Sequence, residues 1–177
     1  MDAPHSVWLM LREDDERQVA TIVRDLAAEF GAPVFRPHLT LVEDNGTAPA
    51  DLAQRVRGLA LAAPRFAADI AGIGASTLYF RSLYARFPAE GPVRALKQRA
   101  IETIAMTPLA EFMPHVSLLY GIADTAEKRA AIARLEPRLT GMRLNFDAVA
   151  MVESAKSIPI ADWRVAARYP LGGAPSP

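Results

Sequence analysis

One seven-residue pattern occurs twice in this 177-residue chain, and it constrains the fold and the chemistry more than any other feature. Residues 35–41 read FRPHLTL, and residues 112–118 read FMPHVSL. Both copies follow the order Phe, any residue, Pro, His, an aliphatic residue, a hydroxyl residue and Leu. A single His-x-Thr or His-x-Ser often arises by chance. Two copies in one matched frame, with the histidines 77 residues apart, indicate an internal duplication.

Each copy has the alternation of a half-buried β-strand. Successive side chains of a strand point to opposite faces. His38 and Thr40 are therefore expected on one face, with Leu39 and Leu41 on the other face, in a core. The second copy repeats this arrangement. Two such strands facing each other would place two imidazoles and two hydroxyl groups around one small cavity.

Hydrophobic periodicity and turn residues predict the same order of elements in both halves: strand, helix, motif strand, helix, strand. The predicted strands cover residues 6–11, 38–42, 66–73, 77–87, 115–120, 143–152 and 163–169, and the predicted helices cover 13–30, 50–61, 92–104 and 125–135. The glycine-rich residues 72–76 are predicted to form a turn between strands, because no helix pattern follows them and phosphate-binding loops of that kind need one.

No linker rich in Pro and Gly separates the halves. We therefore expect a single compact domain of two lobes, about 1–76 and 77–171, with strands able to cross between them. The small-residue tail, 172–177, is expected to be disordered.

The composition limits the class of protein. Hydrophobic residues make up 51% of the chain, which suffices for a sizeable core, and the formal net charge is zero. A long nucleic-acid groove needs clustered basic residues, so none is expected. The absence of Cys excludes disulfides and thiolate metal sites. With no signal peptide and no long apolar run, we expect a cytoplasmic, monomeric protein that does not bind membranes.

Two imidazoles in one site suit paired acid and base chemistry. One can remove a proton from a nucleophile while the other protonates a leaving oxygen. Hydroxyl groups nearby can donate hydrogen bonds to phosphate oxygens on which negative charge builds. This combination suits the cleavage of a phosphodiester without a metal. A strained cyclic phosphate fits well, because its leaving group stays tethered.

Three alternatives remain for the histidines. They could bind zinc, but a third protein ligand is normally needed. His5 is the only other histidine, and Glu43 should face with Leu41, away from His38. A Ser-His-Asp hydrolase lacks a nucleophile-elbow pattern. The histidines could also be purely structural, which fits one copy of the motif better than two.

At these residues the chain resembles the two-histidine phosphoesterase superfamily, and within it the cyclic phosphodiesterase branch of plants and yeast. The resemblance is carried by the two motifs, by the opening Ser-Val-Trp of residues 6–8, by EFGAP at 29–33 and by PHVSLLYG at 114–121. It implies a bilobal α+β fold with a pseudo-two-fold duplication. Each lobe would be an antiparallel sheet with two helices, and a central cleft would lie between the sheets.

The resemblance also implies an activity and a set of site residues. It implies hydrolysis, without a cofactor or metal, of ADP-ribose 1″,2″-cyclic phosphate or a nucleoside 2′,3′-cyclic phosphate. His38 and His115 would be the acid and base, and Thr40 and Ser117 would bind the phosphate; which histidine is the acid stays open. Tyr120 and Trp8 would line the pocket.

Several of these placements have a competing interpretation. Trp8 suits a core as well as it suits a stacking platform. Tyr120 lies three residues beyond Ser117, so an ideal strand would turn it away from the cleft unless the chain bends before Gly121. Tyr79 and Arg81 share a face of a predicted long strand and are expected to face solvent or pair with neighbours. His5 is expected on the surface.

Two other functions remain as alternatives. The superfamily also contains RNA-end processing and 2′-5′ RNA ligase-like enzymes, whose larger substrates should require a basic rim. The neutral net charge argues against such a rim. A nucleotide-binding module without turnover is the other alternative, although both histidines and both hydroxyl residues are present.

Overall fold

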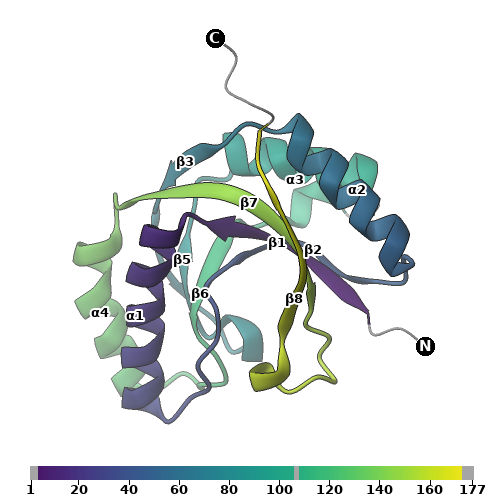
Figure 1. Cartoon of the computed structure of the whole chain (residues 1–177). Helices are drawn as coiled ribbons and strands as arrows, with labels where there is room; N and C mark the ends of the chain where they lie inside the picture. The colour runs from purple at the N-terminus through teal and green to yellow at the C-terminus, as the bar shows by residue number, and fades with distance from the viewer. Residues whose placement is uncertain (1–3, 106–107, 173–177) are drawn as a thin grey trace.

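Two antiparallel sheets and their flanking helices make up the computed structural model, which describes residues 4–105 and 108–172 (Figure 1). The strands are β1 (His5–Leu11), β2 (Leu39–Asn45), β3 (Phe66–Asp69), β4 (Gly72–Ala75), β5 (Leu83–Arg86), β6 (His115–Leu119), β7 (Arg143–Glu153) and β8 (Arg164–Pro170). The α-helices are α1 (Glu13–Phe30), α2 (Pro49–Ala62), α3 (Pro92–Thr103) and α4 (Ala126–Leu139), and short 3-10 helices form at η1 (Tyr79–Arg81), η2 (Leu109–Glu111) and η3 (Ile160–Asp162).

The two copies of the motif lie in different sheets. The larger sheet has the order β2-β1-β7-β3. Strand β3 pairs with the first part of the long strand β7, and β8 pairs with its second part. The smaller sheet has the order β4-β5-β6. Helices α2 and α3 pack on the larger sheet, and α1 and α4 pack on the smaller one (Figure 1). The predicted α+β architecture, with an antiparallel sheet and two helices on each side, is confirmed.

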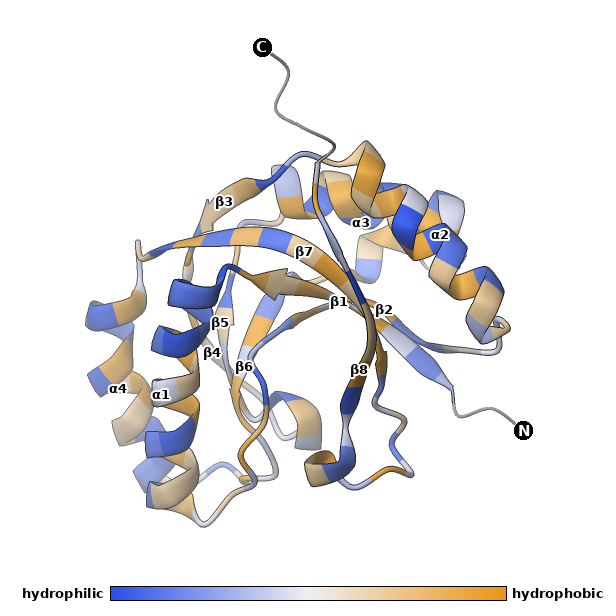
Figure 2. Cartoon of the chain, viewed as in Figure 1, coloured by the Kyte–Doolittle hydropathy of each residue, from blue (hydrophilic) through white to orange (hydrophobic). Residues whose placement is uncertain are grey.

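Strand β1 lies between β2 and β7 in the larger sheet, and both of its faces are buried. All seven of its residues are buried, and Figure 2 shows hydrophobic residues along its C-terminal part. Val7 and Leu9 join the main core, whereas Trp8 and Met10 pack with Ala148 of β7 on the opposite face. The predicted strand is confirmed.

The helices begin and end close to where the sequence predicts. Helix α1 starts with four carboxylates in its first turn, which the helix dipole favours, and Gly31 ends it at a left-handed φ of 63°. Proline is the first residue of α2 and of α3. Helix α4 runs four residues further than predicted and contains Pro137. No helix in the described ranges 4–105 and 108–172 is long and apolar enough to cross a bilayer.

Two predicted strands are wrong in extent. The predicted strand 66–73 is two strands in different sheets, because Phe66–Asp69 pairs with β7 while Gly72–Ala75 pairs with β5. The predicted strand 77–87 begins with η1 and becomes a strand only at Leu83. The hydroxyl group of Ser76 donates a hydrogen bond to the carbonyl oxygen of Arg81 at 2.6 Å, which closes this turn. Tyr79 and Arg81 therefore do not share a strand face.

His5 is not on the surface, contrary to the prediction. Strand β1 begins one residue earlier than expected, and His5 pairs with both Asn45 and Glu153 in the ladder. Its side chain is buried, and its Nε2 lies 3.6 Å from Oε1 of Glu153. The expected disordered tail, 172–177, lies outside the described residues except for Gly172.

Candidate functional site

The four motif side chains line one cavity of about 920 Å³ between the two sheets. Strand β2 supplies Thr40, with His38 just before it, and strand β6 supplies His115 and Ser117. Trp8 and Tyr120 line the same cavity. The structure thus brings together all six residues to which the sequence pointed. The remaining lining residues are Ser6, Glu43, Asp44, Leu78, Tyr79, Phe80, Arg81, Ser154, Lys156, Ser157 and Trp163.

Both histidines are held in the same way by their own motif. The Nδ1 atom of His38 lies 2.7 Å from the carbonyl oxygen of Arg36, and Nδ1 of His115 lies 2.8 Å from that of Met113. A carbonyl oxygen can only accept, so Nδ1 is the donor in each pair. In the neutral ring this leaves Nε2 as the proton acceptor. Two chemically equivalent Nε2 atoms, one from each sheet, are therefore available at the cavity.

Trp8 fixes the ring of His38 and removes it from water. The two rings stack with centroids 3.4 Å apart and an interplanar angle of 5°. Trp163 meets the His38 ring edge-on at 6.5 Å. Burial lowers the pKa of His38 from 6.5 to about 4; the hydrogen bond to Arg36 opposes this shift, and the charges of His115 and Arg36 add to it. Trp8 thus lines the cavity, as expected, but one face of its indole ring is covered by the His38 ring.

His115 is less deeply buried than His38. The rings of Tyr84 and His115 meet edge to face, with centroids 5.3 Å apart and an interplanar angle of 66°. Burial lowers the pKa of His115, the hydrogen bond to Met113 opposes this, and the positive charge of Arg81 lowers it further. Because both pKa values lie below the ordinary 6.5, both imidazoles are mainly neutral at pH 7 in the free protein.

The two hydroxyl groups differ in their present partners. The Ser117 hydroxyl donates a hydrogen bond to the carbonyl oxygen of Phe80 at 2.9 Å. The Thr40 hydroxyl has no hydrogen-bond partner within the described part of the chain. A ligand could take a hydrogen bond from Thr40 directly, whereas Ser117 would have to turn its proton away from Phe80.

Tyr120 reaches the cavity because β6 stops before it. The strand ends at Leu119, and Gly121 adopts a left-handed φ of 72°, which turns the chain. Tyr120 then stacks on Phe35 with centroids 3.7 Å apart. Burial raises the pKa of Tyr120, with the nearby Ser117 opposing the shift, so the phenol keeps its proton at neutral pH. The bend before Gly121 that the sequence argument required is present.

Several residues that line the cavity are not indicated by the sequence. Arg81 and Tyr79 are expected on a strand, but they lie in η1 at the cavity, and Tyr79 is also exposed to solvent, as expected. Trp163 closes one side, and its Nε1 donates to the carbonyl oxygen of Ile158 at 3.1 Å. In the sequence, the aromatic residues around Tyr79 are the one signal that could have pointed to a ligand-binding surface. No periodic pattern singles out Trp163 as a residue of the site.

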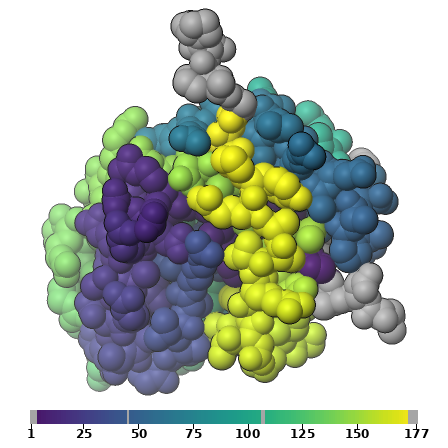
Figure 3. Space-filling view, viewed as in Figure 1, coloured from purple at the N-terminus to yellow at the C-terminus, as the bar shows by residue number. Residues whose placement is uncertain are grey.

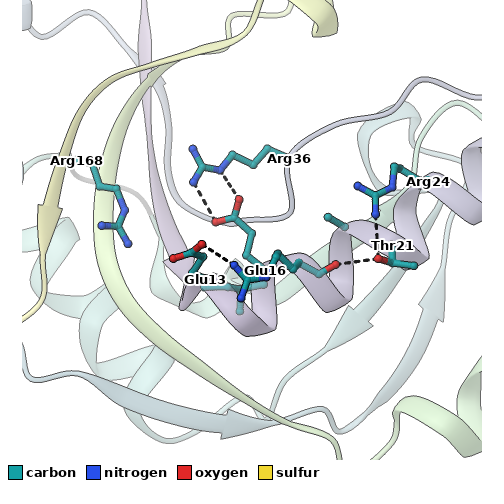
Figure 4. A pocket seen from close by; sticks show the side chains of 9 residues that line it. Glu13, Glu16, Thr21, Arg24, Arg36 and Arg168 are labelled. Atoms are coloured by element: carbon teal, nitrogen blue, oxygen red, sulfur yellow. Dashed lines mark hydrogen bonds and ion pairs between the residues drawn. The ribbon is translucent and has the colours of Figure 1, made fainter.

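A second hollow, of about 560 Å³, lies between α1 and β8 (Figures 3 and 4). Its charged residues are largely paired: Arg36 binds Glu16 through two hydrogen bonds of 2.6 and 3.0 Å, and Arg168 binds Asp147. The Arg36 pair ties the segment before His38 to α1. Within residues 4–105 and 108–172, no group of three or more His, Cys, Asp or Glu side chains is arranged to hold a metal ion.

The buried His38 predicts a pH-dependent stability. Between its folded pKa of about 4 and its ordinary value of 6.5, the unfolded chain binds a proton that the folded chain does not. Stability should therefore fall as the pH falls through this window, by about 2 kcal/mol between pH 8 and pH 5 from this group. Urea denaturation of wild type and His38→Gln across this range measures it. The His38→Gln variant should lose this part of the pH dependence. If the free energy of unfolding changes with pH equally in the two proteins, His38 is not buried in its neutral form.

The chain is similar in sequence to known proteins. A family model described as the 2′-5′ RNA ligase superfamily matches residues 11–157. A cyclic phosphodiesterase of Arabidopsis thaliana is 23% identical over 154 residues, which cover 85% of this chain and 84% of that protein.

Solved structures share the fold at low sequence identity. TT0787 of Thermus thermophilus is 19% identical with a TM-score of 0.63, covering 96% of this chain and 98% of its own. Escherichia coli LigT in complex with 3′-AMP is 14% identical with a TM-score of 0.60, covering 98% of this chain and 100% of its own.

Proposed function

The chain belongs to the 2′-5′ RNA ligase superfamily of two-histidine phosphoesterases, and on this premise we propose that it hydrolyses a cyclic phosphodiester without a metal. The substrate class is a nucleoside 2′,3′-cyclic phosphate or ADP-ribose 1″,2″-cyclic phosphate. One observation carries the proposal: two histidines from different sheets, each anchored through Nδ1, line one cavity with Thr40 and Ser117.

The proposed reaction needs one neutral and one protonated imidazole. Nε2 of the base removes a proton from water as its oxygen adds to phosphorus. The acid gives the proton on its Nε2 to the ribose oxygen as the P–O bond breaks, and the ring opens to a phosphomonoester. His38 is the more deeply buried, and burial disfavours the protonated ring, which favours His38 as the base and His115 as the acid.

The size and walls of the cavity support a nucleotide substrate. A volume of about 920 Å³ is much larger than a phosphate needs and lies within the usual range for small-molecule sites. Phe80, Tyr79 and Trp163 give it an aromatic wall on which a base can stack. The Arabidopsis relative is named a cyclic phosphodiesterase, and LigT has been solved with 3′-AMP. A cytoplasmic location and a monomeric state belong to the same proposal.

Turnover should survive a chelator, because imidazoles perform both proton transfers. The test is a panel of nucleoside 2′,3′-cyclic phosphates and ADP-ribose 1″,2″-cyclic phosphate assayed with EDTA, with products resolved as 2′- or 3′-phosphates. Oligonucleotides ending in a 2′,3′-cyclic phosphate test the RNA-end and ligase alternatives. Activity lost in EDTA and restored by one divalent ion would contradict the proposal, and binding without turnover would identify a nucleotide-binding module.

A further inference from the structure

Arg81 is a cation at the cavity that the two motifs do not account for. It is the last residue of η1, and its carbonyl oxygen accepts the hydrogen bond from Ser76. The carbonyl oxygen of Tyr79 accepts a hydrogen bond of 2.8 Å from the backbone N–H of Gly121. The turn that carries Arg81 is thereby attached to the end of β6, the strand that holds His115 and Ser117.

Among the described residues, the guanidinium group of Arg81 has no hydrogen-bond or ion-pair partner. Its Nε is buried without a hydrogen-bond partner, and it forms no ion pair with a carboxylate in the described part of the chain. Its Cζ lies 5.7 Å from the centre of the Tyr84 ring, whose edge meets His115. Buried donors nearly always have an acceptor, so Arg81 carries an unmet hydrogen bond in a side chain that lines the cavity.

The charge balance of the cavity leads to the same residue. A phosphodiester is an anion, but burial keeps both imidazoles mainly neutral in the free protein. Among the described residues, the cations that line the cavity are Arg81 and the exposed Lys156. The charge of Lys156 acts on the Asp44 carboxyl group, whereas the charge of Arg81 acts on His115. Arg81 is therefore the cation on the side of the histidines.

We propose that Arg81 is a further catalytic residue, whose guanidinium group binds a non-bridging oxygen of the substrate phosphate beside His115. It would attract the anion to a free protein whose imidazoles are mainly neutral, and it would stabilise the negative charge that builds as water adds to phosphorus. Arg81 keeps its protons throughout. The inference rests on the proposed function, in that the bound anion is a phosphodiester.

Arg81→Gln should weaken the binding of inorganic phosphate by about 10- to 100-fold and lower kcat/KM for the best cyclic phosphate by at least as much. Arg81→Lys should recover part of both, because it keeps the charge but loses the planar fork of donors. Arg86→Gln is the matched control. Arg86 lies opposite His115 in the ladder between β5 and β6, is exposed and does not line the cavity. This variant should stay within about threefold of wild type.

Calorimetric titration with inorganic phosphate separates this inference from the proposed function. If wild type cleaves no member of the panel, the proposed function fails, and phosphate binding still compares wild type with Arg81→Gln. Equal phosphate affinities for Arg81→Gln, Arg86→Gln and wild type would overturn the role of Arg81, whether or not wild type turns over. Thermal melts check the fold. If Arg81→Gln does not fold, Arg81→Lys provides the test. A wild-type phosphate affinity and kcat/KM in Arg81→Lys would show that the guanidinium group is not required.

Discussion

Replacing His38 or His115 with alanine should lower kcat by about 10²- to 10⁴-fold, the usual contribution of a positioned acid or base. Each substitution removes an Nε2 that the motif holds at the cavity through the Nδ1 hydrogen bond. The double variant should be far less impaired than the product of the two single effects, because the pair acts as a unit. Steady-state kinetics on the best cyclic phosphate gives all three values.

The pH dependence of kcat/KM should tell the two histidines apart. A base must be deprotonated, so the rate rises with pH through its pKa; an acid must be protonated, so the rate falls with pH through its pKa. With His115 as the acid, His115→Ala should lose the alkaline limb of a bell-shaped profile, and His38→Ala should lose the acid limb. The opposite pattern would reverse the two roles.

His5→Gln is the control for both substitutions. His5 is also buried, but it does not line the cavity, and its partner is Glu153. Its substitution should lower stability while kcat changes by no more than about threefold. A His38 or His115 variant that keeps its fold and turns over like His5→Gln would remove that histidine from the mechanism.

Thr40→Val and Ser117→Ala should each lower kcat/KM by about 10- to 100-fold, because each removes a hydrogen-bond donor to a charged oxygen. Their effects on stability should differ. Ser117→Ala also removes the donor to the carbonyl oxygen of Phe80 and should destabilise the fold by about 1 kcal/mol. Thr40 has no such partner within the described part of the chain, so Thr40→Val should leave stability nearly unchanged.

Leu39→Ala gives the contrasting result on the same strand. Leu39 is buried in the main core, so its truncation should cost about 2–5 kcal/mol of stability. The folded fraction should keep its kcat. Kinetics and urea denaturation on Thr40→Val and Leu39→Ala separate the two faces of β2. If Thr40→Val and Ser117→Ala leave both phosphate affinity and kcat/KM unchanged, the two strands do not share a phosphate.

The sequence predicts the parts of this site that depend on local order. Alternation along β1 and β2 places Trp8 and Thr40 on one face, and they are cross-strand partners in the structure. The Pro-His frame recurs, and with it the local hydrogen bond from each Nδ1 to the carbonyl oxygen two residues earlier. These features follow from periodicity and from a short repeated sequence, both of which can be read without knowing the tertiary fold.

Features that depend on distant partners could not be predicted in this way. Residues 66–73 look like one strand in the sequence, but Asp69 pairs with Arg143 in the larger sheet and Gly72 pairs with Arg86 in the smaller one. His5 is buried because β7 places Glu153 beside it. Strand β2 continues to Asn45, beyond the predicted end at residue 42, and this extension brings Glu43 and Asp44 to the cavity.

The most direct test of the central claim is the response of the three histidine ring signals to phosphate in a proton–carbon NMR titration at constant pH. The chain has only three histidines, so single substitutions assign every imidazole signal. If both motifs bind one phosphate, the His38 and His115 signals should shift together with a single dissociation constant, while the His5 signal stays in place. A shift of only one motif histidine, or two different dissociation constants, would contradict a shared site.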